Sequence, residues 1–178
     1  MRMSVFIAVS LDGMIARTNG DIDWLTATSH LIPGEDFGYG SFISTVDALL
    51  MGRRSFEKVL TFGEWPYGDL PVYVLSNTLT EIPNHLPEHV QRISGSMEQT
   101  IQTLKSSGYQ HVYVDGGKTV QSALRAGAID HMIITRIPIL IGEGISLFGS
   151  LDSDIHLKHV KTVTFKNGLI QSLYDCNY

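Results

Sequence analysis

The turn Asp115-Gly116-Gly117 follows a short β-rich run and precedes a helix-like segment in the sequence HVYVDGGKTVQSAL. Because glycine has no side chain, such a turn lets backbone N–H groups at a helix N-terminus approach the phosphates of a ligand. The same composition also serves as a simple connection between a strand and a helix. On its own, the segment leaves a nucleotide site and a structural turn both open.

A second segment with suitable chemistry is ALLMGRRSFE, in which a strand runs through Gly52 into two arginines and a helix. A phosphate there would meet glycine backbone, the Ser55 hydroxyl and two guanidinium groups. Arginine suits this role because its planar fork donates paired hydrogen bonds to phosphate oxygens. The alternative is that Arg53 and Arg54 are solvated helix charges, with Arg53 paired to Glu57 at i,i+4.

The run VYVLSN ends in a hydroxyl and an amide, at Ser76 and Asn77. In dinucleotide sites that prefer NADH, an acidic residue binds the adenosine ribose hydroxyls and would repel a 2′-phosphate. This run carries no acid, so with an arginine nearby it suits NADPH better than NADH. The alternative is that Ser-Asn-Thr merely turns the chain.

Two loops complete the set of segments with a chemical interpretation. SLDGMIA leaves the first strand, where open α/β sheets tend to bind ligands. We expect Asp12 to be structural in a tight turn, and residues 14–16 to touch a cofactor through backbone. IPILIGEGISLF lacks the third spaced glycine of a Rossmann fingerprint, so we expect only a loop beside the site.

The elements that must position these segments alternate along the chain. β-rich runs cover residues 4–10, 48–51, 72–75, 111–114 and 132–137, and helix-like stretches cover residues 36–45, 54–60, 97–106 and 119–126. Such alternation predicts an α/β fold with a mostly parallel sheet. Near the C-terminus, strand-like runs flank Asn167-Gly168, a pair typical of a type I′ hairpin turn, so the sheet is expected to end in antiparallel strands.

Composition narrows the classes of function. The 178 residues fit one domain, over residues 1–178, and the formal charge of −5 gives no reason to expect nucleic acid as a partner. The one cysteine, Cys176, favours a reducing compartment, and cytoplasm is the simplest location. The apolar run 5–9 is too short for a signal peptide or a membrane span. The seven histidines are scattered, so we predict no metal site.

In this order, SLDGMIA, MGRRSFE, VLSN, VYVDGGKTVQSAL and IPILIGEGISLF resemble the dihydrofolate reductase-like superfamily. The resemblance is greatest to the bacterial branch that includes the reductase domain of the bifunctional riboflavin-biosynthesis deaminase-reductase, and it spans nearly the whole chain. It implies a three-layer fold with helices on both faces of the sheet, and an NADPH-dependent reductase. A homodimer is compatible with the resemblance.

The resemblance also assigns cofactor-binding residues by their position in the motifs. The residues that would lie near the adenosine phosphates are Gly52, Arg53, Arg54 and Ser55, and those beside the 2′-phosphate are Ser76 and Asn77. The pyrophosphate would be held by Gly116, Gly117, Lys118 and Thr119. The nicotinamide would be bordered by Ala8 and Ile15.

For the substrate, the resemblance points to a carboxylate before the MGR strand, and counting back from Gly52 gives Asp36. Asp36 could bind an amino-pyrimidine edge and deliver a proton, with partial burial raising its pKa. The alternative is that Glu35 and Asp36 only stabilise a helix N-terminus. The aromatic residues that could wall a flat heterocycle, or simply form core, are Trp24, Phe37, Tyr39, Trp65 and Tyr67.

The chain departs from both related groups of reductases. Where riboflavin-pathway reductases carry an Asp-Asn-Pro-like substrate segment, it has RRSFEKVLTFGEWPYG, and its VDGG turn is shorter than the glycine turn of folate reductases. The expected substrate is therefore either a pyrimidine of the 5-amino-6-(5-phosphoribosylamino)uracil type or a dihydrofolate-like pterin. The alternatives are a non-catalytic NADPH-binding regulatory protein and a structural subunit that binds no NADPH.

Overall fold

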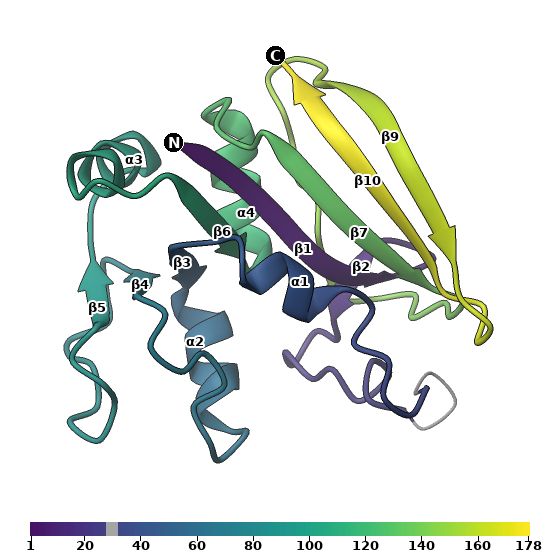
Figure 1. The fold of residues 1–178 in the computed structure, drawn as a ribbon, viewed down its shortest axis with the longest axis horizontal. Helices are drawn as coiled ribbons and strands as arrows, with labels where there is room; N and C mark the ends of the chain where they lie inside the picture. Colours follow the sequence, from purple (N-terminus) through teal and green to yellow (C-terminus); the bar gives the residue numbers. More distant parts are fainter. Residues whose placement is uncertain (28–31) are drawn as a thin grey trace.

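The computed structural model describes residues 1–27 and 32–178. An eight-stranded sheet in the order β5-β4-β3-β6-β1-β7-β10-β9 forms its centre (Figure 1). The strands are β1 (Arg2–Ser10), β3 (Ala48–Gly52), β4 (Val72–Leu75), β5 (Val90–Ile93), β6 (His111–Asp115), β7 (His131–Ile137), β9 (His156–Thr164) and β10 (Ile170–Asn177). A second, two-stranded sheet pairs β2 (Met14–Ala16) with β8 (Ile145–Ser146).

The strands from β5 through β7 are parallel to their neighbours, whereas β10 and β9 pair antiparallel at one edge. This arrangement confirms the predicted fold class. Since parallel strands share their direction, β1, β3, β4, β6 and β7 all end at the same edge of the sheet. The loops that leave this edge carry the segments with a chemical interpretation.

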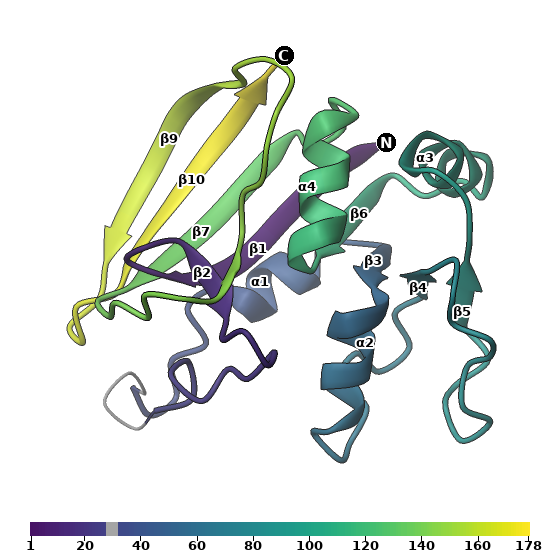
Figure 2. The same ribbon diagram turned by 180° about the vertical axis from the view of Figure 1, so that it is seen from behind.

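The helices are α1 (Tyr39–Ile43), α2 (Arg53–Leu60), α3 (Met97–Ser106) and α4 (Gly117–Arg125). Side chains alternate between the faces of each strand. In β6, Val112 and Val114 pack with α3 and α4, whereas Tyr113 packs against Phe42 of α1 on the other face. Helices therefore cover both faces, with α1 in front of the sheet in Figure 1 and α4 in front in the reverse view of Figure 2.

Two local expectations were wrong, and three short strands were not predicted. The hairpin between β9 and β10 does not have a type I′ turn, which needs a positive φ at both central residues, because only Gly168 has one (φ 85°). Phe165 and Leu169 pair across a three-residue loop instead. The helix expected over residues 36–45 starts only at Tyr39, because Phe37 and Gly38 have positive φ angles of 56° and 82°. The short strands β2, β5 and β8 were not predicted.

No helix in the described part of the chain is long and apolar enough to cross a membrane. Within residues 1–27 and 32–178, no group of three or more His, Cys, Asp or Glu side chains is placed to hold a metal ion.

Candidate active site

A cavity of about 1210 Å³ opens at the carboxyl edge of the parallel strands. It is lined by the ends of β1, β3, β6 and β7, by the first turns of α2 and α4, and by the chain leading into α1. Cavities that hold one drug-sized ligand measure roughly 300–1,000 Å³. This cavity can therefore accept a dinucleotide together with a second small molecule.

The two glycine-containing turns meet inside this cavity. β3 and β6 are neighbours in the sheet, so α2 and α4 start side by side. Gly116 has φ 88°, and a Cβ at that position would collide with the Ser55 hydroxyl. A Cβ on Gly52 would lie 2.7 Å from Oγ1 of Thr119. These contacts explain the glycines, because any side chain would push the two helix N-termini apart.

Both of these helix N-termini lack a side-chain cap. α2 starts after Gly52 and α4 after Gly116, and neither helix has a side chain that accepts a hydrogen bond from its first turn. By contrast, α3 has a complete capping box in which Ser96 and Gln99 bind each other's backbone N–H groups. The free N–H groups of α2 and α4 are thus available to an anion in the cavity.

Four cationic side chains of the described residues line the cavity, and all belong to α2 or α4. Arg53 pairs with Glu57 at 3.2 Å, as expected for an i,i+4 pair, and also donates to Thr78 at 2.9 Å. Arg54 and Lys118 make no hydrogen bond or ion pair with any described residue. These two side chains are therefore free to bind a phosphate.

Ser76 and Asn77 do not line the cavity. Ser76 is buried, and its hydroxyl accepts hydrogen bonds from the N–H groups of Thr78 and Leu79. The Asn77 side chain accepts one from the N–H of Gly95. Thr78, which the sequence did not single out, lines the cavity and binds Arg53. The predicted hydroxyl-bearing turn is thus present, but the residue that lines the cavity is Thr78, one position after Asn77.

Ala8 and Ile15 line the cavity. The loop between them is held by Asp12, which accepts hydrogen bonds from Ser10 at 2.5 Å and from the N–H of Gly142 at 2.7 Å. These bonds lower the pKa of Asp12 to about 2. The structural role expected for Asp12 is confirmed, since its carboxylate joins the first loop to the loop after β7.

Aromatic side chains form the other end of the cavity. We call this part the aromatic end, and it comprises Phe6, Phe37, Tyr39, Tyr67, Tyr113 and the carboxyls of Asp36 and Asp115. The rings of Phe6 and Tyr39 lie 5.6 Å apart, and the Tyr113 hydroxyl donates to the Phe6 carbonyl at 2.8 Å. Trp24 is only 2% exposed and packs against Ile137 and Leu169, outside the lining. Trp65 also lies outside it, against Phe56 and Tyr67.

Asp36 lines the cavity, but its environment differs from the expected one. The side chain is exposed, and its two oxygens accept hydrogen bonds from the N–H groups of Gly38 and Gly40, both at 2.8 Å. These bonds lower the pKa of Asp36. The expectation of partial burial and a raised pKa was therefore wrong. The carboxylate stabilises the start of α1, as the alternative explanation of this residue predicted.

The carboxyl with a raised pKa is that of Asp115, the last residue of β6. Burial at the bottom of the cavity raises its pKa, although the N–H of Gly116 and the hydroxyl of Tyr113 partly oppose this. Burial, and then the nearby Asp115, raise the pKa of Tyr39 to about 12 and also raise that of Tyr67. Asp115 stands at the end of a strand and before two glycines, and this position is the sequence signal that could have identified it.

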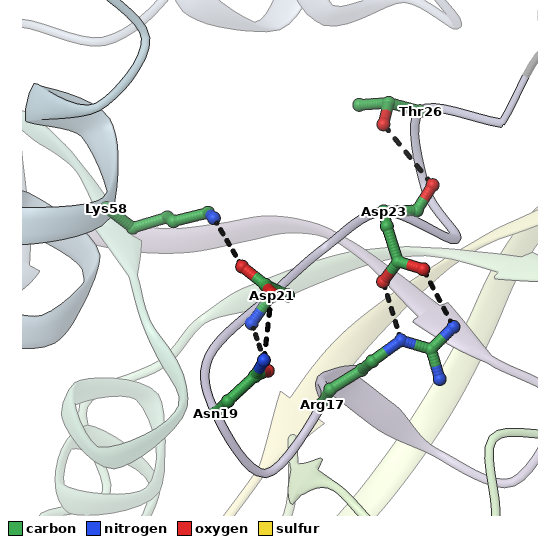
Figure 3. A network of polar contacts seen from close by, with 6 residues as sticks. All are labelled: Arg17, Asn19, Asp21, Asp23, Thr26 and Lys58. Atoms are coloured by element: carbon green, nitrogen blue, oxygen red, sulfur yellow. Dashed lines mark hydrogen bonds and ion pairs between the residues drawn. The ribbon is translucent and has the colours of Figure 1, made fainter.

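A polar network braces the loop that follows β2 (Figure 3). Lys58 of α2 pairs with Asp21 at 3.0 Å, and Asn19 donates to the same carboxylate. Arg17 forms a two-pronged pair with Asp23, at 2.6 and 2.9 Å. The loop is thereby tied to α2, so Lys58 already has an anionic partner within the protein.

The sequence profile described as RibD C-terminal domain matches residues 3–171. The chain belongs to this family. A curated relative, "Uncharacterized protein YwjB" of Bacillus subtilis (strain 168), is 38% identical over 165 residues, which cover 90% of each chain.

Solved structures similar to this RibD C-terminal domain agree in fold. "Putative riboflavin biosynthesis protein" from Shewanella sp. PV-4 is 40% identical, with a TM-score of 0.93 and full coverage of both chains. Dihydrofolate reductase of Schistosoma mansoni is 21% identical, with a TM-score of 0.66 and 99% coverage of each chain. The dihydrofolate reductase-like fold that the sequence motifs implied is therefore confirmed.

Proposed function

We propose that this protein is an NADPH-dependent reductase that acts on a small heterocycle of the pyrimidine or pterin type. One observation carries the proposal: two uncapped helix N-termini, with their glycines in contact, open into the same cavity as a half-buried carboxyl of raised pKa. Membership of the RibD C-terminal domain family and likeness to a dihydrofolate reductase support it.

The residues at the two glycine turns fit the phosphates of a dinucleotide. Backbone N–H groups after Gly116 would bind the pyrophosphate together with the free side chain of Lys118. Arg54 and Ser55 would bind phosphate oxygens from the neighbouring helix. Arg53, held beside Thr78, is the side chain best placed for a 2′-phosphate. No acidic residue in this turn would repel that group.

When bound, the cofactor supplies a hydride from its nicotinamide ring. The protein's own contribution is to bind and orient the substrate ring and to provide the proton. Asp115 holds a proton more readily than an ordinary carboxyl, because its burial disfavours the charged form. We therefore assign proton delivery to Asp115 rather than to Asp36. The Gly116 N–H would stabilise the carboxylate that remains.

A regulatory protein that binds NADPH without turnover is the second candidate. The N-termini of α2 and α4, which would bind the phosphates, do not depend on the Asp115 side chain. The test is spectrophotometric oxidation of NADPH by the purified protein with a panel of 5-amino-6-(ribosylamino)uracils and dihydropterins. NADPH oxidation that also forms the matching reduced product, a ribitylaminouracil or a tetrahydropterin, would support the reductase. NADPH binding without turnover across the panel would favour the regulatory protein instead.

A further inference from the structure

The charges that line the cavity are distributed unevenly. Its cations are Arg53, Arg54, Lys58 and Lys118, among the residues that the structure describes. All four project from α2 or α4, the helices whose N-termini form the phosphate-binding end. The four residues outside the described range, 28–31, include no lysine or arginine, and His30 is their one ionisable residue.

The aromatic end has the opposite character. It is walled by rings from β1, β6, the start of α1 and the loop before β4, and the only acidic or basic side chains that the described residues place there are Asp36 and Asp115. Asp36 is already satisfied by two backbone N–H groups, so Asp115 is the carboxyl that a ligand's N–H groups can bind. No cation of the described lining belongs to this end.

From this distribution we infer that the substrate is a flat heterocycle that donates N–H groups and carries no phosphate. This inference rests on the proposed function and narrows it, because the uracil substrate of the riboflavin type has a phosphoribosyl tail. The rings would stack on the heterocycle, and Asp115 would accept from its amino or ring N–H groups.

A phosphorylated substrate would be disfavoured for two reasons. Its phosphate, if held at the aromatic end, would meet no cation among the described lining residues and would lie near the Asp36 carboxylate, and an unpaired charge is costly in a partly desolvated site. If the phosphate instead reached towards α2 and α4, it would compete with the phosphates of the cofactor. Lys58 lies further along α2 than Arg53 and Arg54, and it is already paired with Asp21.

The test uses calorimetric titration of the protein saturated with NADP⁺. The two ligands are 5-amino-6-(ribitylamino)uracil and its 5′-phosphate, which differ only in the phosphate, and 7,8-dihydrobiopterin serves as a phosphate-free pterin. We expect at least one phosphate-free compound to bind, and the uracil to bind at least as tightly as its 5′-phosphate. Because binding is measured, the result shows whether a substrate phosphate is tolerated even if no turnover occurs.

Two variants test which side chain binds the substrate. Asp115→Asn is expected to lower the affinity for the phosphate-free ligands by tenfold or more and to leave the affinity for NADP⁺ unchanged. Lys58→Gln should leave both affinities unchanged. A 5′-phosphate that binds more than tenfold tighter than its parent, and loses that advantage in Lys58→Gln, would overturn the inference. So would failure of all three compounds to bind a protein that does bind NADP⁺. Failure to bind NADP⁺ and NADPH would instead overturn the proposed function.

Discussion

Two aspartates in one cavity have opposite environments. Asp36 is exposed and accepts two backbone hydrogen bonds, which favour its charged form and lower its pKa. Asp115 is half-buried among tyrosines, and loss of solvation favours its neutral form and raises its pKa. Only the second environment suits a proton donor near neutral pH. A carboxyl's environment, which residue type alone does not reveal, decides its role here.

The proton-donor role makes Asp115→Asn informative. General acid catalysis contributes about 10²–10⁴-fold, so we expect kcat to fall by at least about a hundredfold while the Kd for NADPH stays the same. In the wild type, kcat should fall as pH rises through the raised pKa of Asp115, because the carboxyl then loses its proton. Stopped-flow hydride transfer across pH measures both effects. The matched control is Asp36→Asn, and a larger loss of kcat in that variant would reverse the assignment.

Asp12 is expected to link stability to pH. Its folded pKa of about 2 lies below the ordinary value of 3.8, so its contribution to stability is present above about pH 4 and is lost as pH falls towards 2. Asp12→Asn should therefore lower the urea midpoint near neutral pH, and the difference from wild type should shrink near pH 2. Equal differences at both pH values would show that the bonds to Ser10 and Gly142 do not depend on the carboxylate charge.

At the scale of elements, the contact between the starts of α2 and α4 determines the phosphate-binding end. Gly116→Ala would force a Cβ against Ser55 in a backbone conformation that alanine rarely adopts, so we expect NADPH affinity to fall by tenfold or more. Gly63→Ala is the control, because Gly63 has a similar φ of 90° but open space around it. Calorimetry measures NADPH affinity, and thermal unfolding measures Tm. Both variants should have a lower Tm, but only Gly116→Ala should lose NADPH affinity.

The cap of α3 offers a complementary test. Ser96→Ala removes the capping box and should cost about 1 kcal/mol of folding free energy. Because α3 does not line the cavity, NADPH affinity should be unchanged. Chemical denaturation and calorimetry measure the two quantities. A fall in affinity equal to that of Gly116→Ala would mean that the cofactor effect in Gly116→Ala reflects general destabilisation.

The elements that the sequence predicted well are those with a clear local signal. Apolar strands such as residues 48–51 are buried on both faces, and the glycine turns before α2 and α4 carry their own backbone requirement. The short strands β2, β5 and β8 gave no such signal, since their pairing depends on partners far along the chain. The start of α1 was misplaced because the positive φ of Phe37 depends on tertiary contacts, including the bond that its carbonyl accepts from Gln171.

At the scale of the whole molecule, the site exists because parallel strands bring distant segments to one edge. β1, β3, β6 and β7 are adjacent in the sheet, although their carboxyl ends are separated by up to 127 residues, from Ser10 to Ile137. The sequence identified the segments with phosphate chemistry through their glycines and arginines. It could not predict the burial of Asp115 or the orientation of Thr78, because both depend on the assembled sheet.

The central claim is that the cavity binds NADPH through its phosphates, and calorimetric titration with NADPH and NADH in parallel tests it most directly. We predict micromolar binding that favours NADPH by more than about tenfold, or about 1.4 kcal/mol. In Arg53→Ala that preference should be lost, whereas Arg54→Ala should weaken both nucleotides together. Equal affinity for the two nucleotides in the wild type, or binding of neither, would contradict the account.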